Sequence, residues 1–222
     1  VGRKVNIIIA PDIQAFGDGA LAIISVNEVF TNAGTVIQNE GNIHGGIRTG
    51  LSDDLLRNKA SGSIFLDDST IDLGDGENAF INEGELFANG DTNFIGIGAG
   101  NLFTNNGNSI HMNDGAADDS LTIAGDFNGT GGVFVDVDGT SLTADSLFID
   151  GNVLAGTANT ITINMVSPVG LSDIADGAEI AIVSVSGTSQ AGNFILNPIS
   201  GAVSGLYTFD YSLNYNQGDY AL

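Results

Sequence analysis

The chain consists of short apolar segments that alternate with turns rich in glycine, asparagine and aspartate. In segments such as 63–66, 70–73 and 109–112, apolar residues occupy at least every second position, as expected for β-strands with one buried face. The sequence contains 32 Gly, 23 Asn and 21 Asp, all poor helix formers. This pattern predicts an all-β protein with many short strands and excludes a helical bundle.

A three-residue element recurs through the first half of the chain: an apolar residue, any residue and then Asn, with a glycine soon after. Its five copies are Phe30-Thr31-Asn32, Ile37-Gln38-Asn39, Leu56-Arg57-Asn58, Phe80-Ile81-Asn82 and Phe103-Thr104-Asn105. The major copies end at residues 32, 58, 82 and 105, so they are 26, 24 and 23 residues apart. Such a period is typical of a β-solenoid, in which each coil buries its apolar face against its neighbours.

The repeated element, with its Asn and the glycine after it, is expected at the corners where each coil turns. Both residues tolerate left-handed backbone conformations, and Asn side chains stacked from coil to coil can form hydrogen-bonded ladders. The alternative is an antiparallel sandwich with evenly spaced hairpins. That fold favours a turn signal about every 8 to 12 residues and gives no reason to repeat one corner sequence.

The second half of the chain has a different character. After about residue 118 the Asn-Gly element disappears and longer, β-branched strands are expected at 121–123, 133–137, 147–149, 161–165, 180–185, 194–196 and 207–213. The last 16 residues hold all four tyrosines, Tyr207, Tyr211, Tyr215 and Tyr220. A solenoid needs a terminal cap because an open last coil exposes its core and a strand edge, and Tyr suits a half-buried surface. We therefore expect coils over residues 1–117 and a C-terminal cap over 118–222.

The charge distribution excludes two classes of partner. All five Lys and Arg lie in the first 59 residues, whereas residues 60–222 carry 21 Asp and Glu. Nucleic acids and anionic lipid surfaces both require basic side chains, so neither is an expected partner. The acidic surface favours a soluble monomer. No segment approaches the roughly 20 apolar residues of a membrane helix, so we expect no direct membrane insertion, and without Cys there are no disulfides or thiolate metal sites.

Several motifs in the second half occur in a characteristic order. Residues 119–127 read DSLTIAGDF, followed by GTGG at 129–132 and the strand at 133–137. Residues 144–151 read ADSLFIDG, and residues 207–213 read YTFDYSL. In this order the motifs resemble the C-terminal passenger and autochaperone region of pertactin-like (type V) autotransporters of Gram-negative bacteria. The resemblance covers about residues 118–222, and the upstream Asn-Gly coils fit the family more loosely.

The resemblance implies a right-handed parallel β-helix with a C-terminal β cap, exported and threaded across the outer membrane. In that family a C-terminal translocator barrel anchors the passenger, and the segment before the barrel folds first as an autochaperone. The resemblance therefore implies a translocator barrel in the parent chain. This sequence starts at Val1 without Met, and we expect it to be a piece of a longer protein. The implied location is the bacterial cell surface, tethered or released. The implied role of the whole protein is adhesion or virulence, with a host-surface protein or glycan as a partner.

No combination of residues predicts an enzyme. The two histidines, His44 and His111, are 67 residues apart, lack a Gly-x-Ser-x-Gly element, and are expected on the coil surface. Glycoside hydrolysis needs two carboxylates, but acidic doublets are common by chance at this acid density, and no basic residue follows Lys59 to hold an acidic polymer. The doublets are Asp53-Asp54, Asp67-Asp68 and Asp118-Asp119.

Calcium is the better chemical candidate, because clustered carboxylates are hard oxygen ligands. Residues 74–80 approach a calcium-binding nonapeptide, but Leu73 and Asn78 stand where the pattern requires Gly and Asp. The segment 136–139 misses the EF-hand spacing. We therefore assign no catalytic, cofactor-binding or metal residues and keep opportunistic calcium binding open. The alternatives to a passenger stalk are a secreted β-helix that acts on or binds polysaccharide, and a calcium-stabilised secreted solenoid.

Overall fold

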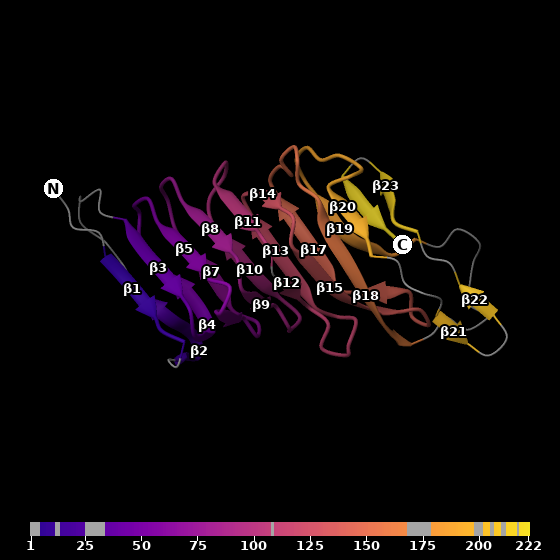
Figure 1. The fold of residues 1–222 in the computed structure, drawn as a ribbon, viewed down its shortest axis with the longest axis horizontal. Helices are drawn as coiled ribbons and strands as arrows, with labels where there is room; N and C mark the ends of the chain where they lie inside the picture. Colours follow the sequence, from indigo (N-terminus) through magenta and orange to yellow (C-terminus); the bar gives the residue numbers. More distant parts are fainter. Residues whose placement is uncertain are drawn as a thin grey trace.

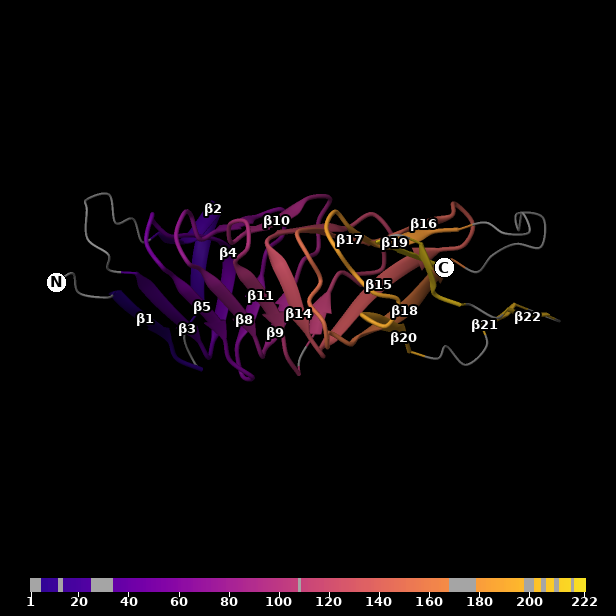
Figure 2. The same ribbon diagram turned by 90° about the horizontal axis from the view of Figure 1, so that it is seen from above.

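The computed structural model describes residues 5–11, 14–24, 34–107, 109–167, 179–197, 202–204, 207–209, 212–216 and 218–222. The regular elements in these residues are β-strands, and parallel strands stack in chain order into a β-solenoid of about five turns (Figures 1 and 2). The predicted all-β solenoid is confirmed. The sandwich alternative is wrong, because strands one coil apart pair in parallel and not as antiparallel hairpins.

Each coil has three faces, which we name A, B and C. Face A is a sheet of six parallel strands. Its strands are β1 (Val5–Ile9), β3 (Thr35–Asn39), β5 (Leu55–Asn58), β8 (Ala79–Asn82), β11 (Leu102–Asn105) and β14 (Asp126–Gly129).

Faces B and C belong to one bent sheet. The bend lies in β4 (Asn42–Arg48), which pairs with β6 through its first half and with β7 through its second half. Face B continues through β6 (Ser63–Phe65), β9 (Glu85–Phe87), β12 (Ser109–His111), β15 (Gly132–Asp138), β18 (Asn159–Ser167) and β20 (Phe194–Leu196). Face C continues through β7 (Thr70–Asp72), β10 (Asn93–Gly96), β13 (Ser120–Ala124), β17 (Ser146–Asp150), β19 (Ala181–Val185), β24 (Asp219–Ala221) and β23 (Asn214–Asn216).

Four further strands lie outside these three series. The first, β2 (Gln14–Ile24), runs parallel to β4. The second, β16 (Thr143–Ala144), pairs antiparallel with the end of β15, and β21 (Ala202–Ser204) and β22 (Tyr207–Phe209) form a separate hairpin. Most strands expected in the second half are present, although the segment 207–213 is a strand only over Tyr207–Phe209, and residues 210–211 lie outside the described part.

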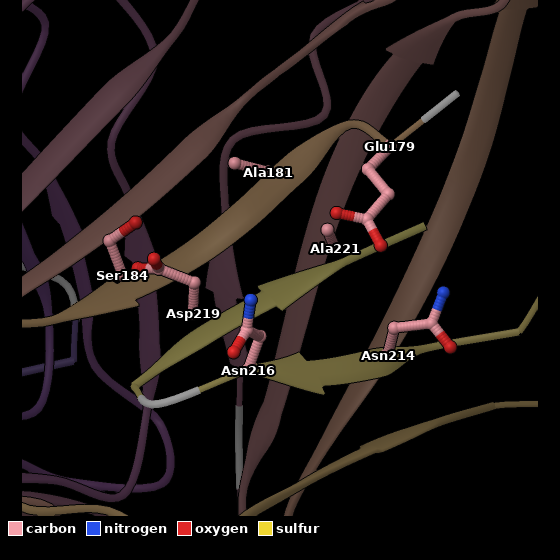
Figure 3. Close-up of a pocket in the computed structure, with 7 residues that line it drawn as sticks. All are labelled: Glu179, Ala181, Ser184, Asn214, Asn216, Asp219 and Ala221. Atoms are coloured by element: carbon pink, nitrogen blue, oxygen red, sulfur yellow. The ribbon is translucent and has the colours of Figure 1, made fainter. Parts of the chain in front are cut away.

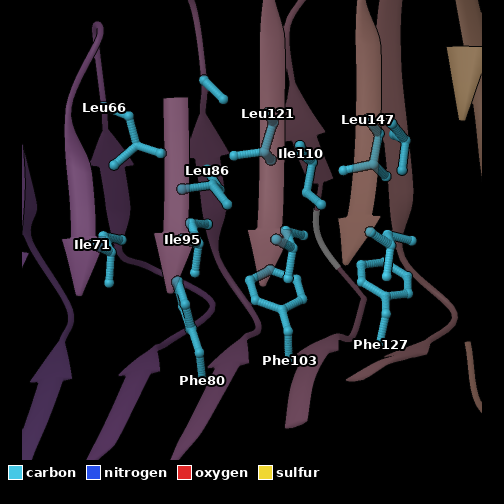
Figure 4. Packing of buried hydrophobic residues seen from close by; sticks show 14 of the residues in the cluster. Leu66, Ile71, Phe80, Leu86, Ile95, Phe103, Ile110, Leu121, Phe127 and Leu147 are labelled. Carbon is cyan, nitrogen blue, oxygen red and sulfur yellow. The ribbon is translucent and has the colours of Figure 1, made fainter. Parts of the chain in front are cut away.

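The core is a set of columns in which residues of successive coils align (Figure 4). On face A, the strand register places Leu56, Phe80, Phe103 and Phe127 in one fully buried column. Faces B and C contribute parallel columns of Ile, Leu and Val. Burying each such side chain stabilises the fold by about 1.5–3 kcal/mol. Because each residue packs mainly on its counterparts one coil away, stability depends on neighbouring coils being formed.

The predicted asparagine ladder is present and fully buried at the end of face A. Nδ2 of Asn39 donates to Oδ1 of Asn58 at 2.8 Å, and Asn58 donates in the same way to Asn82 at 2.9 Å. Asn82 then donates to Oδ1 of Asn105 at 3.1 Å. The register aligns Asn58 with Asn39, 19 residues earlier, so this step of the ladder is shorter than the 26 residues that separate the copies at Asn32 and Asn58. Asn32 lies outside the described residues.

The ladder continues past a coil that has no asparagine at this position. The register aligns Asn105 with Gly129, and Asn159 from the following coil supplies the next amide. Nδ2 of Asn105 donates to Oδ1 of Asn159 at 3.0 Å, and Asn159 donates to the Gly129 carbonyl at 3.1 Å. Gly129 has a φ of +122°, and a Cβ there would lie 2.0 Å from the Asn105 carbonyl oxygen. Only glycine leaves room for this arrangement.

The C-terminal end of face C is closed by an antiparallel hairpin, in which β24 pairs with β19 and β23 pairs with β24. Tyr220 is fully buried, and its ring lies 4.9 Å from Phe194 and 5.0 Å from Tyr215. The Tyr215 hydroxyl donates to the Ser189 carbonyl at 2.9 Å. We call β23 and β24 the hairpin cap, and it contains two of the four tyrosines. Tyr211 lies outside the described residues.

The division of the chain at residues 117 and 118 stays a prediction. Strands on the two sides of it continue the same sheets, since β10 pairs with β13 and β11 pairs with β14.

Candidate functional site on face C

The two histidines lie in one aromatic column on the outside of face B. His44, Phe65, Phe87, His111 and Phe134 stack in that order, with ring centroids 4.4, 4.6, 4.8 and 4.8 Å apart. Each ring covers the face of the next, so the column contributes to packing between coils. The sequence predicted two separate histidines on the coil surface, whereas the fold brings both into one stack.

His111 has a carboxylate partner in this column. Its Nε2 lies 2.5 Å from Oε2 of Glu85, and its Nδ1 lies 3.3 Å from Oδ1 of Asn113. The imidazole therefore has polar contacts at both nitrogens and ring contacts on both faces. This environment fits a packing role.

The acidic doublets serve mainly as acceptors at the coil corners. In two of them the residues point in opposite directions: Asp53 and Asp118 are exposed, whereas Asp54 and Asp119 are buried. Both buried carboxylates accept a backbone N–H from a neighbouring coil. The doublet at 67–68 is exposed at a turn with φ values of 43° and 62°. The buried carboxylates of Asp54 and Asp119 are therefore used in hydrogen bonds to the backbone at the coil corners.

The segment that approaches a calcium-binding repeat is also a corner. Asn78 is buried, and its Oδ1 accepts the Asp54 backbone N–H at 2.9 Å. Its Nδ2 donates to the Gly74 carbonyl at 2.9 Å. The side chain at the position of the expected ligand thus points into the fold. In the described part of the chain, no group of three or more His, Asp or Glu side chains is arranged to hold a metal ion.

Three buried carboxylates meet where faces B and C join. Oδ1 of Asp145 accepts the Asp119 N–H at 3.0 Å, and Oδ2 accepts the Asp136 N–H at 2.6 Å. Burial, with a smaller contribution from the neighbouring carboxylates, raises the pKa of Asp145 to about 7 and that of Asp119 to about 6. These groups link β13, β15 and β17 from inside the fold, so their role is structural.

The exposed side of face C carries a continuous row of side chains, which we call the face C strip. Adjacent members are direct partners in the register of neighbouring strands. From β10 to β23 they are Phe94, Thr122, Phe148, Ser184, Asp219 and Asn216. Phe94 is 37% exposed and Phe148 is 40% exposed, which is unusual for side chains of this size.

A pocket of about 260 Å³ lies at the cap end of the strip (Figure 3). Carboxylates and carboxamides stand around two alanines, which face each other across β19 and β24. We call this the cap pocket, and its residues are Glu179, Ala181, Ser184, Asn214, Asn216, Asp219 and Ala221. Small side chains at the base and polar groups at the rim suit recognition of a polar ligand.

Sequence reasoning missed this site. One signal was available: the run Leu147-Phe148-Ile149 is apolar at every position, so a strand there must expose one large apolar side chain. The cap pocket left no such signal, because Glu179 and Asn214 are distant in sequence and meet only when the hairpin docks on β19.

Neither a family model, nor a curated protein, nor a solved structure matches this chain. Within the described residues, no helix is long and apolar enough to cross a membrane.

Proposed function

We propose that this chain is the surface-exposed or secreted passenger stalk of a Gram-negative autotransporter, and that its C-terminal part promotes folding of the coils above it. The observation that carries the proposal is a β-solenoid whose C-terminal end is closed by a hairpin cap. The motifs that resemble the autotransporter family form β13, β14 and β17, close to this cap. The role is structural, and no catalytic step is assigned to it.

A continuous row of buried aromatic rings connects the cap with the coils. Tyr220 packs on Phe194, whose ring lies 5.8 Å from Phe127. Phe127 stacks on Phe103 at 5.5 Å, and Phe103 contacts Phe80 at 4.8 Å. A single coil cannot bury its own apolar face, so the first stable nucleus needs a closed end. The cap supplies one, and each later coil then adds to a formed template.

The order of folding tests this proposal. Pulsed hydrogen exchange during refolding of the full chain should protect amides of β13, β17 and β19 before those of β5, β6 and β8. Simultaneous protection, or protection that begins at β5, would refute the autochaperone role.

Two matched substitutions in the same column separate folding from stability. Tyr220→Ala removes a buried ring at the cap, and Leu56→Ala removes a buried side chain at the far end. Both should destabilise the protein by about 2–5 kcal/mol. Only Tyr220→Ala should slow refolding strongly, whereas Leu56→Ala should mainly speed unfolding. Equal effects on the refolding rate would contradict a nucleus at the cap.

Export tests the passenger role itself. The chain is placed between a secretion signal and a translocator barrel in a Gram-negative host, and added protease reports its exposure on intact cells. The stalk proposal predicts surface display that Tyr220→Ala reduces more than Leu56→Ala. A chain that folds in vitro but stays inside the cell in this arrangement would argue against the passenger role.

A further inference from the structure

The face C strip combines features that point to a ligand. We propose that it binds an extended, uncharged glycan chain, with sugar rings on Phe94 and Phe148 and a terminal sugar in the cap pocket. This inference goes beyond the stalk function and does not depend on it, since the strip would bind in the same way on a freely secreted solenoid.

The two exposed phenylalanines differ from the other outward rings of the solenoid. On face B the outward rings stack on one another, so their faces are covered. On face C, Thr122 separates Phe94 from Phe148, and in the described residues neither ring contacts another aromatic ring. A Cβ at Gly96 would lie 2.8 Å from the Phe94 ring, so this ring lies over Gly96 along the sheet. Such a ring can receive the apolar C–H face of a sugar.

The spacing of the rings suits a linear glycan. Phe94 and Phe148 are two strands apart, and neighbouring strands are separated by about 4.8 Å, so the rings are about 10 Å apart along the solenoid. This is close to the length of two hexose rings in an extended chain, so alternate sugars would meet an aromatic ring. Thr122 lies between them and offers a hydroxyl. The whole strip, five strand spacings from β10 to β23, is about 24 Å long.

The cap pocket supplies the polar half of the site. Asp219 and Glu179 accept hydrogen bonds, Asn214 and Asn216 both donate and accept, and Ser184 adds a hydroxyl. Sugar hydroxyls need donors and acceptors together, and this set provides both. Figure 3 shows these groups around Ala181 and Ala221, where short side chains leave room for a ring.

The charges select among possible occupants. Exposed carboxylates of Asp150, Asp219 and Glu179 lie on or beside the strip, in a chain of net charge −22. An anionic polysaccharide or an anionic lipid surface would be repelled. A protein partner is disfavoured because protein interfaces have a contiguous apolar centre, whereas here Thr122 separates the two rings and Ser184 follows Phe148 on its other side. An uncharged glycan satisfies both the rings and the polar groups.

The test is calorimetric titration of the full chain with linear hexasaccharides of glucose and of N-acetylglucosamine, and with hexagalacturonate as the anionic probe. At least one uncharged hexasaccharide should bind with a dissociation constant of about 1 mM or tighter, and hexagalacturonate should not bind. Absence of binding by both uncharged probes, or binding of hexagalacturonate alone, would overturn the proposal.

Substitutions locate the binding on the strip. Phe94→Ala, Phe148→Ala and Asp219→Asn should each weaken binding about tenfold, and Gly96→Val should do the same by displacing the Phe94 ring without removing it. Ile195→Ala is the matched control, since it trims an exposed apolar side chain (51% exposed) on face B. Unchanged circular dichroism melts establish that each variant is folded. Affinity that is insensitive to both phenylalanine substitutions, or equally sensitive to Ile195→Ala, would place the glycan elsewhere and overturn the assignment.

Discussion

The centre of the asparagine ladder offers a sharp test of the fold, through the nearly isosteric change Asn82→Asp. Asn82 is fully buried, accepts from Nδ2 of Asn58 at 2.9 Å and donates to Oδ1 of Asn105 at 3.1 Å. A carboxylate at residue 82 can still accept from Asn58, but it cannot donate. One carboxylate oxygen of the new side chain would then lie against Oδ1 of Asn105, and both of these atoms are acceptors.

The neighbouring amide cannot simply turn over to repair this contact. Nδ2 of Asn105 already donates to the Gly132 carbonyl at 3.1 Å and to Oδ1 of Asn159 at 3.0 Å. Turning the amide would bring its oxygen against both acceptors. An unpaired buried acceptor costs about 1–3 kcal/mol, and a buried charge adds to this cost. We therefore expect Asn82→Asp to lower the free energy of unfolding by about 2–5 kcal/mol at neutral pH.

Protonation should restore part of this loss, because a neutral carboxyl group has an O–H that can donate to Asn105. The measurement is urea unfolding followed by circular dichroism at about pH 7 and about pH 5, with each variant compared with the wild type at the same pH. Asn106→Asp is the control, since it adds the same charge at an exposed site beside Asn105, the residue that pairs with Asn82 in the next coil. The reasoning fails if Asn82→Asp costs no more than this control, or if its cost does not change with pH.

Three further predictions concern the interior and the cap. Burial raises the pKa of Asp145 to about 7 and that of Asp119 to about 6, so the folded state binds more protons than the unfolded state. The free energy of unfolding should therefore increase as pH falls from about 8 to about 5, and this added stability should be lost as pH rises through the two pKa values. Asp145→Asn should flatten this dependence in urea titrations, and an unchanged slope would contradict the assignment. Gly129→Ala should destabilise by more than about 2 kcal/mol, whereas Gly156→Ala, which shares a positive φ but has open space around its Cβ, should cost about 1–2 kcal/mol in the same assay. Tyr220→Phe, which keeps the ring but removes the hydrogen bond to the Gln190 carbonyl, should cost about 1 kcal/mol in thermal melts, and a loss as large as that of Tyr220→Ala would show that the hydroxyl outweighs the ring.

The amino-acid sequence by itself determined the class of fold. A repeat with a period in the twenties and an Asn-Gly corner predicts coils that stack, and the alternation of apolar and polar residues assigns side chains to the inside or the outside. Leu56, Phe80 and Phe103 lie in the core as their repeat requires, and the asparagines that follow them form the ladder. These features are local, because each depends on a few neighbouring residues and is repeated along the chain.

Only the tertiary structure decided which coils align and which outward residues share a face. Corner lengths vary between coils, so the partner of Asn58 lies 19 residues back and Asn159 fills the space above Gly129. In the same way, Phe94 and Phe148 enter one strip because their strands are two coils apart on face C, and Asp219 joins that strip only through the antiparallel hairpin. The physical reason is that a sequence period assigns a residue to the inside or outside of its strand, whereas strand register and coil stacking set its neighbours in space.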